Sequence, residues 1–185
     1  MAATLDYNYI AKLVRLAQGG DSDAFAELYL ATYQRLYAFS CRYLKDEYLA
    51  QDAVQETYIK ALQHLNQVQD ASLVVSWLGQ INMRVCYRMQ HRLSRTQTVS
   101  DESFDLIRPP DESTNPENEV VRIDYNDYLI RQLLNLPFTE SQALLMRYYH
   151  NMKLEEIADM MDISVSTVKR SIKSGIARLK RTIKS

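Results

Sequence analysis

Residues 152–181 read MKLEEIADMMDISVSTVKRSIKSGIARLKR, and the spacing of apolar residues in this stretch decides the fold. Apolar side chains recur at three- and four-residue steps before Asp162 and again after Ser164, which predicts a short helix followed by a longer one. These positions are Leu154, Ile157, Ala158 and Met161, then Val165, Val168, Ile172, Ile176 and Leu179. Ser164 is a favourable N-cap for the second helix. The arrangement predicts a helix-turn-helix, whose second helix enters the major groove of DNA.

The second helix of this pair carries the side chains that we expect to contact DNA. Residues 163–185 hold seven basic side chains and no acidic one, although the formal net charge of the chain is −1. The residues expected to reach base edges are Ser164, Ser166, Thr167, Lys169, Arg170 and Lys173. Lys180 and Arg181 lie later and suit phosphate groups, which position a protein on DNA without reading its sequence. A solvated helical face with a basic bias is the alternative interpretation.

The rest of the chain lacks the residues that a β-rich fold needs. Among 185 residues there are four glycines and four prolines, too few for the turns of an all-β protein, while 46% of residues are apolar. Three of the prolines fall in residues 95–118, an acidic segment without helical periodicity, which indicates a flexible linker. We therefore predict an all-α protein of two small domains, residues 1–94 and 119–185, joined by that linker.

Further helices are predicted on both sides of the linker. In the N-terminal domain they run from Thr4 or Asp6 to about Gln18, and over about 22–44, 47–65 and 72–94, the third with Leu62 on its core side. In the C-terminal domain a helix over about 118–135 is broken by Pro137. Thr139 and Gln142 then predict a capping box at the start of the next helix.

Arginines form a stripe on the helix predicted over 72–94. Arg84, Arg88, Arg92 and Arg95 recur at steps of four, four and three, and residues 71–100 contain no acidic side chain. Because arginine contacts phosphate bidentately or stacks on a base, the stripe is a candidate nucleic-acid surface. A solvated or salt-bridged face would produce the same pattern.

Neither an enzyme active site nor a metal centre is visible in the sequence. The three histidines are far apart, and Cys41 and Cys86 lie within apolar helical patterns where reduced thiols are expected. Nothing resembles a paired nucleophile and base or a phosphate-binding glycine loop, so we expect no catalytic residue, cofactor or metal. Without a signal peptide or a membrane-spanning stretch, a cytoplasmic protein that does not insert into membranes is expected.

Four segments, taken in order, resemble one protein family. They are GDSDAFAELYLATYQRLYAFSCRYLKD at 20–46, DAVQETYIKAL at 52–62, WLGQI at 77–81, and LPFTESQALLMRYYHNMKLEEIADMMDISVSTVKRSIKSGIARLK at 136–180. Together with the acidic linker they are similar to the extracytoplasmic-function sigma factors of bacteria, over nearly the full length. The first three segments resemble the family's region 2, and the last closely resembles its region 4.

This resemblance implies an alternative sigma factor that binds RNA polymerase core and directs promoter-specific transcription initiation under an anti-sigma factor. The family's D-x-x-Q-E helix docks on the β′ coiled coil, which carries over to Asp52, Gln55 and Glu56. Residues 66–76 and the helix that follows would melt the −10 element of promoter DNA and capture an unstacked base. The candidate contacts there are Asn82, Arg84, Arg88, Arg92 and Arg95. The helix-turn-helix would read the −35 element and contact the β flap.

The sequence departs from the family pattern around the −10 candidates. Val75 stands where the family usually has a basic residue, and Asn82, Arg84 and Arg88 stand where it usually has Ala, Asn and Asp. Two other interpretations stay open: a helix-turn-helix regulator that binds duplex DNA without polymerase, and a sigma-like interaction protein that binds no promoter. The motif beginning at Asp52 and the long acidic linker favour the sigma factor.

Overall fold

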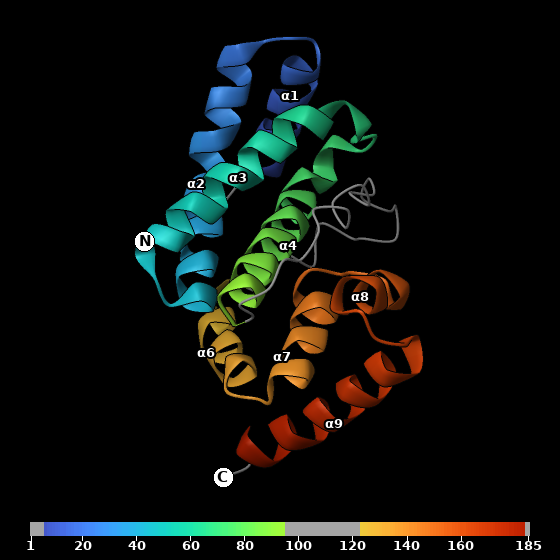
Figure 1. Ribbon diagram of the computed structural model, residues 1–185. Helices are drawn as coiled ribbons and strands as arrows, with labels where there is room; N and C mark the ends of the chain where they lie inside the picture. The colour runs from blue at the N-terminus through green and yellow to red at the C-terminus, as the bar shows by residue number, and fades with distance from the viewer. Residues whose placement is uncertain (1–5, 95–122, 184–185) are drawn as a thin grey trace. The chain divides into compact units, whose positions relative to one another are not determined.

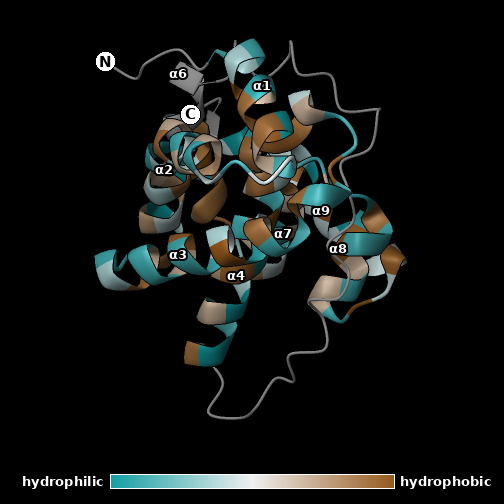
Figure 2. Ribbon diagram, turned by 90° about the horizontal axis from the view of Figure 1, so that it is seen from above, coloured by the Kyte–Doolittle hydropathy of each residue, from teal (hydrophilic) through white to brown (hydrophobic). Residues whose placement is uncertain are grey.

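The computed structural model of the chain describes residues 6–94 and 123–183, and within these two ranges the secondary structure is helical with no strand (Figure 1). Contacts divide the chain into two compact units, residues 1–120 and 121–185. The expected all-α protein of two small helical domains, the second with a helix-turn-helix, is confirmed. Figure 2 shows hydrophilic and hydrophobic residues mixed along single helices, as amphipathic helices require.

Within residues 6–94, the described part of the first unit, there are four helices and two short 3₁₀ turns. They are α1 (Tyr7–Gln18), α2 (Ser22–Leu44), α3 (Glu47–His64), η1 (Leu65–Gln67), η2 (Ala71–Leu73) and α4 (Val74–Ser94). Asp6, Asp21 and Asp46 are the N-caps of α1, α2 and α3, and each carboxylate accepts two backbone N–H groups that the helix leaves unbonded. The helix starts predicted at residues 22 and 47 are therefore confirmed, and of the two N-caps offered for the first helix, Thr4 and Asp6, it is Asp6 that caps α1.

The core of the first unit lies where α2, α3 and α4 pack side by side (Figure 1). Trp77, Leu78 and Ile81 of α4 are buried there with Leu28 of α2. Three buried alanines, Ala50, Ala53 and Ala61, let α3 approach its neighbours closely. Leu62, predicted on the core side of α3, is instead 60% exposed. The prediction was wrong because α3 has apolar residues on two faces, and its small residues are the ones inside.

The second unit contains α6 (Ile123–Leu134), α7 (Phe138–Leu144), the π-helical turn η4 (Leu145–Tyr149), α8 (Leu154–Met161) and α9 (Val165–Ile183). The last two helices are the short and the longer helix predicted from the apolar spacing on either side of Asp162 and Ser164. The capping box at Thr139 was wrong: Pro137 is the N-cap of α7 and makes no side-chain cap bond, so Thr139 lies inside the first turn.

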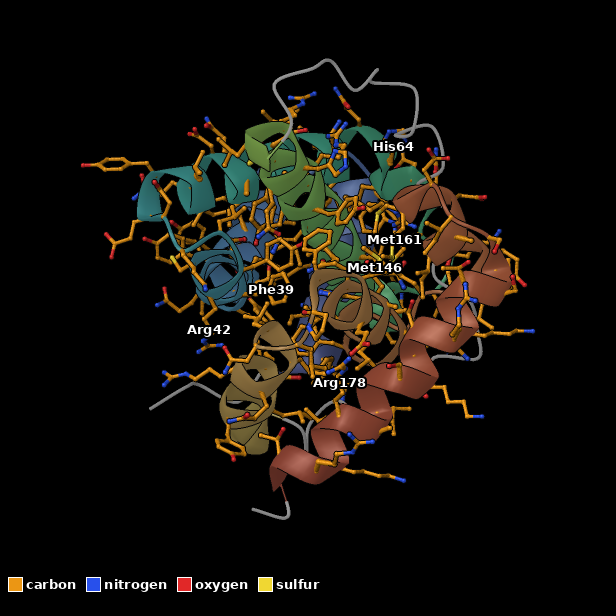
Figure 3. The ribbon with its side chains drawn as sticks, turned by 60° about the horizontal axis from the view of Figure 1, so that its bottom comes forward. Phe39, Arg42, His64, Met146, Met161 and Arg178 are labelled. Atoms are coloured by element: carbon orange, nitrogen blue, oxygen red, sulfur yellow. The ribbon has the colours of Figure 1, made fainter. Side chains whose placement is uncertain are left out.

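Helices α7 and α9 of the second unit cross closely at Gly175. A Cβ at that position would lie 2.6 Å from Cδ1 of Leu144 and 3.3 Å from Cβ of Glu140. Beside the crossing, the Glu140 carboxylate accepts hydrogen bonds from Ser174 Oγ at 2.7 Å and from Arg178 Nε at 3.2 Å. Arg178 is labelled in Figure 3. These contacts fix the direction of α9 against α7.

Candidate nucleic-acid interface

The turn between α8 and α9 has the backbone geometry of a helix-turn-helix. Asp162 ends α8 in the left-handed conformation, with φ 52° and ψ 48°, and the Ile163 N–H donates to the Ala158 carbonyl at 3.1 Å. Ser164 follows, and its Oγ accepts the Thr167 N–H at 3.2 Å. The N-cap role expected of Ser164 is thus present, and it starts α9 directly after the turn.

The first turns of α9 present hydroxyl and basic groups to solvent. Val168 and Ile172 bury one face of the helix, whereas Ser166, Lys169, Arg170 and Lys173 are exposed on the rest. Ser164 Oγ lies 2.8 Å from Ser166 Oγ and 2.9 Å from Thr167 Oγ1, and Arg170 Nη2 donates to Thr167 Oγ1 at 3.3 Å. Lys180 and Arg181 are exposed near the other end. Such a face combines base-reading donors with phosphate-binding cations.

The loop between α3 and α4 separates polar and apolar side chains cleanly. Val68, Ala71 and Leu73 are buried at 2%, 4% and 2% exposure. The exposed side chains between and before them are Asn66, Gln67, Gln69 and Asp70. Asp70 Oδ1 accepts from Ser72 N at 2.9 Å and from Ser72 Oγ at 2.6 Å, which starts η2. The loop therefore holds three amide side chains in solvent on a backbone packed against the first unit.

Asn82 is part of the core of the first unit, which corrects its expected contact with DNA. Its side chain is 0% exposed and joins three helices. Asn82 Oδ1 accepts from Ser40 Oγ and Thr57 Oγ1, both at 3.1 Å, and Nδ2 donates to the Leu36 carbonyl at 3.3 Å. Because all these groups are buried, the amide satisfies polar atoms that would otherwise be unpaired.

Two of the four arginines in the predicted stripe on α4 are covered. From Leu73 to Tyr87 every residue except Gly79 is buried, since α4 packs against α1, α2 and α3. Arg84 is 6% exposed, which corrects its assignment to the DNA surface. Arg88 is also held inside the unit, by an ion pair described below, whereas Arg92 is exposed. Arg95 lies outside the residues that the structure describes.

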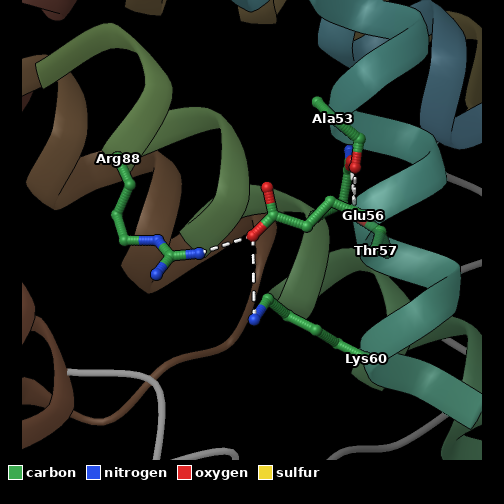
Figure 4. A network of polar contacts seen from close by, with 6 residues as sticks. Ala53, Glu56, Thr57, Lys60 and Arg88 are labelled. Carbon is green, nitrogen blue, oxygen red and sulfur yellow. Dashed lines mark hydrogen bonds and ion pairs between the residues drawn. The ribbon is translucent and has the colours of Figure 1, made fainter. Parts of the chain in front are cut away.

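Glu56, one of the three predicted polymerase contacts, is bonded to a member of the arginine stripe. Its Oε1 is 2.7 Å from Arg88 Nη2 and 3.7 Å from Lys60 Nζ, and Figure 4 shows both cations converging on it. The Arg88 side chain is 11% exposed and that of Glu56 is 34% exposed. This pair joins α3 to α4. At Arg88 the alternative interpretation of the stripe, a salt-bridged face, therefore applies, and Glu56 is only partly available to a partner.

Asp52 and Gln55 lie on an exposed stripe of α3 that is longer than the sequence indicated. Positions 48, 52, 55, 59 and 62 recur at steps of four and three, so they share one face of the helix. Its apolar members are Tyr48, Ile59 and Leu62, with exposures of 81%, 54% and 60%. A repeat of this kind fits the side of another helix, with apolar contacts flanking a polar centre. The spacing of these five positions is present in the sequence, but the prediction that Leu62 lies on the core side concealed the exposed face.

Neither a metal centre nor a membrane span is found among the described residues. No group of three His, Cys, Asp or Glu side chains in residues 6–94 and 123–183 is arranged to hold an ion. No helix in the same ranges combines the length and apolar character needed to cross a bilayer. Burial raises the pKa of Cys86 to about 12, so its thiol is neutral near neutral pH.

Both units resemble proteins of one class. Residues 28–96 match sigma-70 region 2, and residues 126–179 match sigma-70, region 4. The ECF RNA polymerase sigma factor SigW of Bacillus subtilis is 23% identical over 185 residues, which cover 95% of this chain and 97% of SigW. The ECF RNA polymerase sigma-E factor of Escherichia coli (strain K12) is 28% identical over 166 residues, 86% of each chain. The structure of CnrH in complex with the cytosolic domain of CnrY has a similar fold, with a TM-score of 0.51, 19% identity, and coverage of 95% and 97%.

Proposed function

The chain belongs to the extracytoplasmic-function sigma factors, and we propose from this how its two units share promoter recognition. It is an alternative sigma factor, which binds RNA polymerase core and directs initiation at particular promoters. Residues 1–94 bind the polymerase and the −10 element, residues 95–118 connect the units, and residues 119–185 bind the −35 element. The protein acts in the cytoplasm through binding alone and catalyses no reaction.

Recognition of the −35 element is assigned to the exposed face of α9. The observation that carries this assignment is the capped start of α9 beside a tight turn, with Ser166, Lys169, Arg170 and Lys173 in solvent. In a helix-turn-helix these first turns lie in the major groove, where arginine pairs with guanine through two hydrogen bonds. Lys180 and Arg181 contact phosphates farther along, and the same unit meets the β flap.

Docking on the polymerase is assigned to the exposed stripe of α3. Asp52 and Gln55 form its polar centre, and the flanking Tyr48, Ile59 and Leu62 supply apolar area. The partner is the β′ coiled coil, whose helical surface suits a stripe with this repeat. Glu56 contributes from the side while it is bonded to Arg88.

Contact with the −10 element is assigned to the loop 66–72 and to the exposed end of α4. Amide side chains bind adenine through paired hydrogen bonds, and the loop exposes Asn66, Gln67 and Gln69. Arg92 adds a cation for the phosphates, with Arg95 following it. Asn82 and Arg84 are left out of this surface because both are buried.

An anti-sigma factor regulates the chain in this proposal. The similar protein CnrH is found in complex with the cytosolic domain of CnrY, a second protein. A partner of this kind needs to cover only the α3 stripe or the α9 face to prevent initiation, because each is exposed and each is required.

In vitro transcription with purified core polymerase tests the proposal. RNA starts that appear only with this protein, and that share −35 and −10 elements, are the expected result. Gln55→Lys should weaken core binding, whereas Gln34→Lys makes the same change at an exposed position of α2 and should not. Core binding without new starts would favour a sigma-like interaction protein, and DNA binding without core binding would favour a conventional regulator.

The recognition helix has its own matched pair of variants. Arg170→Ala should lower the magnitude of the free energy of binding to the −35 element by about 1–3 kcal/mol. It should also relax the preference for one base pair of that element. Lys180→Ala should weaken binding to all DNA sequences alike. The slope of log affinity against log salt concentration should fall by the amount expected for about one phosphate contact. Equal effects of the two variants on every sequence would contradict base reading by Arg170.

A further inference from the structure

Gln18, the last residue of α1, is bonded to the loop between α3 and α4. Its Nε2 donates to the Leu65 carbonyl at 2.9 Å and to the Val68 carbonyl at 2.8 Å. Both hydrogens of one amide group are therefore used on two backbone carbonyls of η1 and the residue after it. Helix α1 precedes residue 28, where the match to sigma-70 region 2 begins.

The end of α1 is built so that Gln18 stays in place. Gly20 has φ 95°, a conformation that favours glycine, and its N–H donates to the Ala17 carbonyl at 3.0 Å. The N–H of Asp21 donates to the Leu16 carbonyl at 3.2 Å. These bonds close the last turn of the helix, so the Gln18 side chain starts from a fixed backbone.

A second tie joins the same helix to the far end of the loop. Ile10, Leu13 and Val14 bury the inner face of α1, and α1 contacts both η1 and η2. Hydrogen bonds from Ser72 hold the pKa of Asp70 below its usual value, and the positive charge of Arg15 on α1 lowers it further. The bonds of Gln18 near Leu65 and the packing of α1 on η2 thus hold the loop at both of its ends.

We propose that Gln18 is a positioning residue for the −10 element: it fixes the loop backbone so that Asn66, Gln67 and Gln69 meet an unpaired DNA strand in a preset arrangement. This rests on the proposed function, in which that loop binds the strand. Taking a base out of the stack costs a few kcal/mol, so ordering the loop at the same time would weaken capture further. Gln18 removes that second cost because the loop is ordered before DNA arrives.

Two substitutions at Gln18 test this in the full-length chain. Gln18→Met keeps the length of the side chain and removes both donors, while Gln18→Glu places a carboxylate against two carbonyl oxygens. Lys12→Met is the matched control, because Lys12 is an exposed residue of the same helix. The probes are a single-stranded oligonucleotide carrying the −10 element mapped by transcription, a duplex carrying the −35 element, and core polymerase.

The expected result is selective. Gln18→Met and Gln18→Glu should weaken binding of the single strand by about tenfold, since hydrogen bonds that order the loop are lost. The first unit should unfold at a somewhat lower urea concentration, because the two hydrogen bonds of Gln18 are lost. The chain stays folded under binding conditions, so its affinities for the −35 duplex and for core polymerase should match those of the unmodified chain. Lys12→Met should leave all of these measurements unchanged.

Other outcomes overturn the proposal in distinguishable ways. Asn66→Ala and Gln67→Ala test the loop itself: if they weaken single-strand binding and the Gln18 variants do not, the positioning role is wrong and the proposed function stands. If neither set has an effect, the loop does not bind the strand, and both assignments fail. If the Gln18 variants lower the urea midpoint of the first unit and also weaken binding of the single strand, the −35 duplex and core polymerase alike, Gln18 contributes to stability alone.

Discussion

Replacing Asn82 with alanine separates a packing role from a DNA-contact role for this side chain. In Asn82→Ala the Ser40 hydroxyl loses the Oδ1 acceptor that it reaches at 3.1 Å, in a site with 0% exposure for both residues. Leaving one buried donor unpaired costs about 1–3 kcal/mol. The small cavity left by the carboxamide adds about 1 kcal/mol. We therefore expect a loss of about 2–4 kcal/mol from the free energy of unfolding.

The assay follows urea unfolding by tryptophan fluorescence. Trp77 is the only tryptophan of the chain and is fully buried in the same helix, so its signal reports the first unit alone. Adding Ser40→Ala to Asn82→Ala removes the stranded hydroxyl, and the double variant should lose less than the sum of the two single losses. The Ser40 bond then appears as a coupling energy of about 1 kcal/mol.

Binding of the single-stranded −10 oligonucleotide supplies the opposing test. At a temperature where Asn82→Ala stays folded, its affinity for the strand should equal that of the unmodified chain. An unchanged unfolding free energy together with a tenfold loss of affinity would refute the packing role. It would return Asn82 to the DNA surface.

Three further predictions concern other contacts. Gly175→Ala should destabilise the second unit by about 1 kcal/mol. Its Cβ would lie 2.6 Å from Leu144 Cδ1, which has to shift, and 3.3 Å from Glu140 Cβ, and the helix preference for alanine offsets part of this overpacking. Calorimetry of the full chain measures the change, and a gain in stability would mean that Leu144 moves freely. Arg88→Met should lower the free energy of unfolding, measured in urea, by about 1–2 kcal/mol, because Glu56 is left without its 2.7 Å partner. This value lies between those for exposed and buried ion pairs. An unchanged free energy would show that the pair contributes nothing. Burial and a pKa of about 12 should keep Cys86 unmodified by iodoacetamide at pH 8 until the chain unfolds in urea, as mass spectrometry would show.

The helix-turn-helix was predictable because its signals are local. Apolar spacing, the cap at Ser164 and the charge of residues 163–185 all lie within one stretch of sequence, and the structure has the same two helices. The burial of Arg84 was not predictable, because a helix packed on several sides hides polar residues that periodicity places outside. The Leu62 error has the same origin, since periodicity finds the faces of a helix without saying which one is covered.

Hydrogen bonds between residues far apart in the chain also could not be predicted from the sequence. Gln18 meets Leu65 and Val68 across 47 and 50 positions, and Asn82 meets Ser40 across 42. A lone glutamine or asparagine carries no pattern that names its partner. The ion pair between Glu56 and Arg88 could not be predicted for the same reason. Arg88, which stands where the resemblance leads one to expect an acidic residue, was the one signal that the contacts at this position differ.

The ion pair between Glu56 and Arg88 limits how chimeric proteins can be made from this chain. A donor α4 without arginine at position 88 leaves Glu56 without its 2.7 Å partner, which costs about 1–2 kcal/mol, as for Arg88→Met. Exchanging residues 47–64 together with 74–94 brings in the donor's own residues at both positions and avoids this loss. Promoter preference grafted through α4 alone should therefore give hybrids of lower stability, whereas an exchange of α9 alters neither residue of the pair.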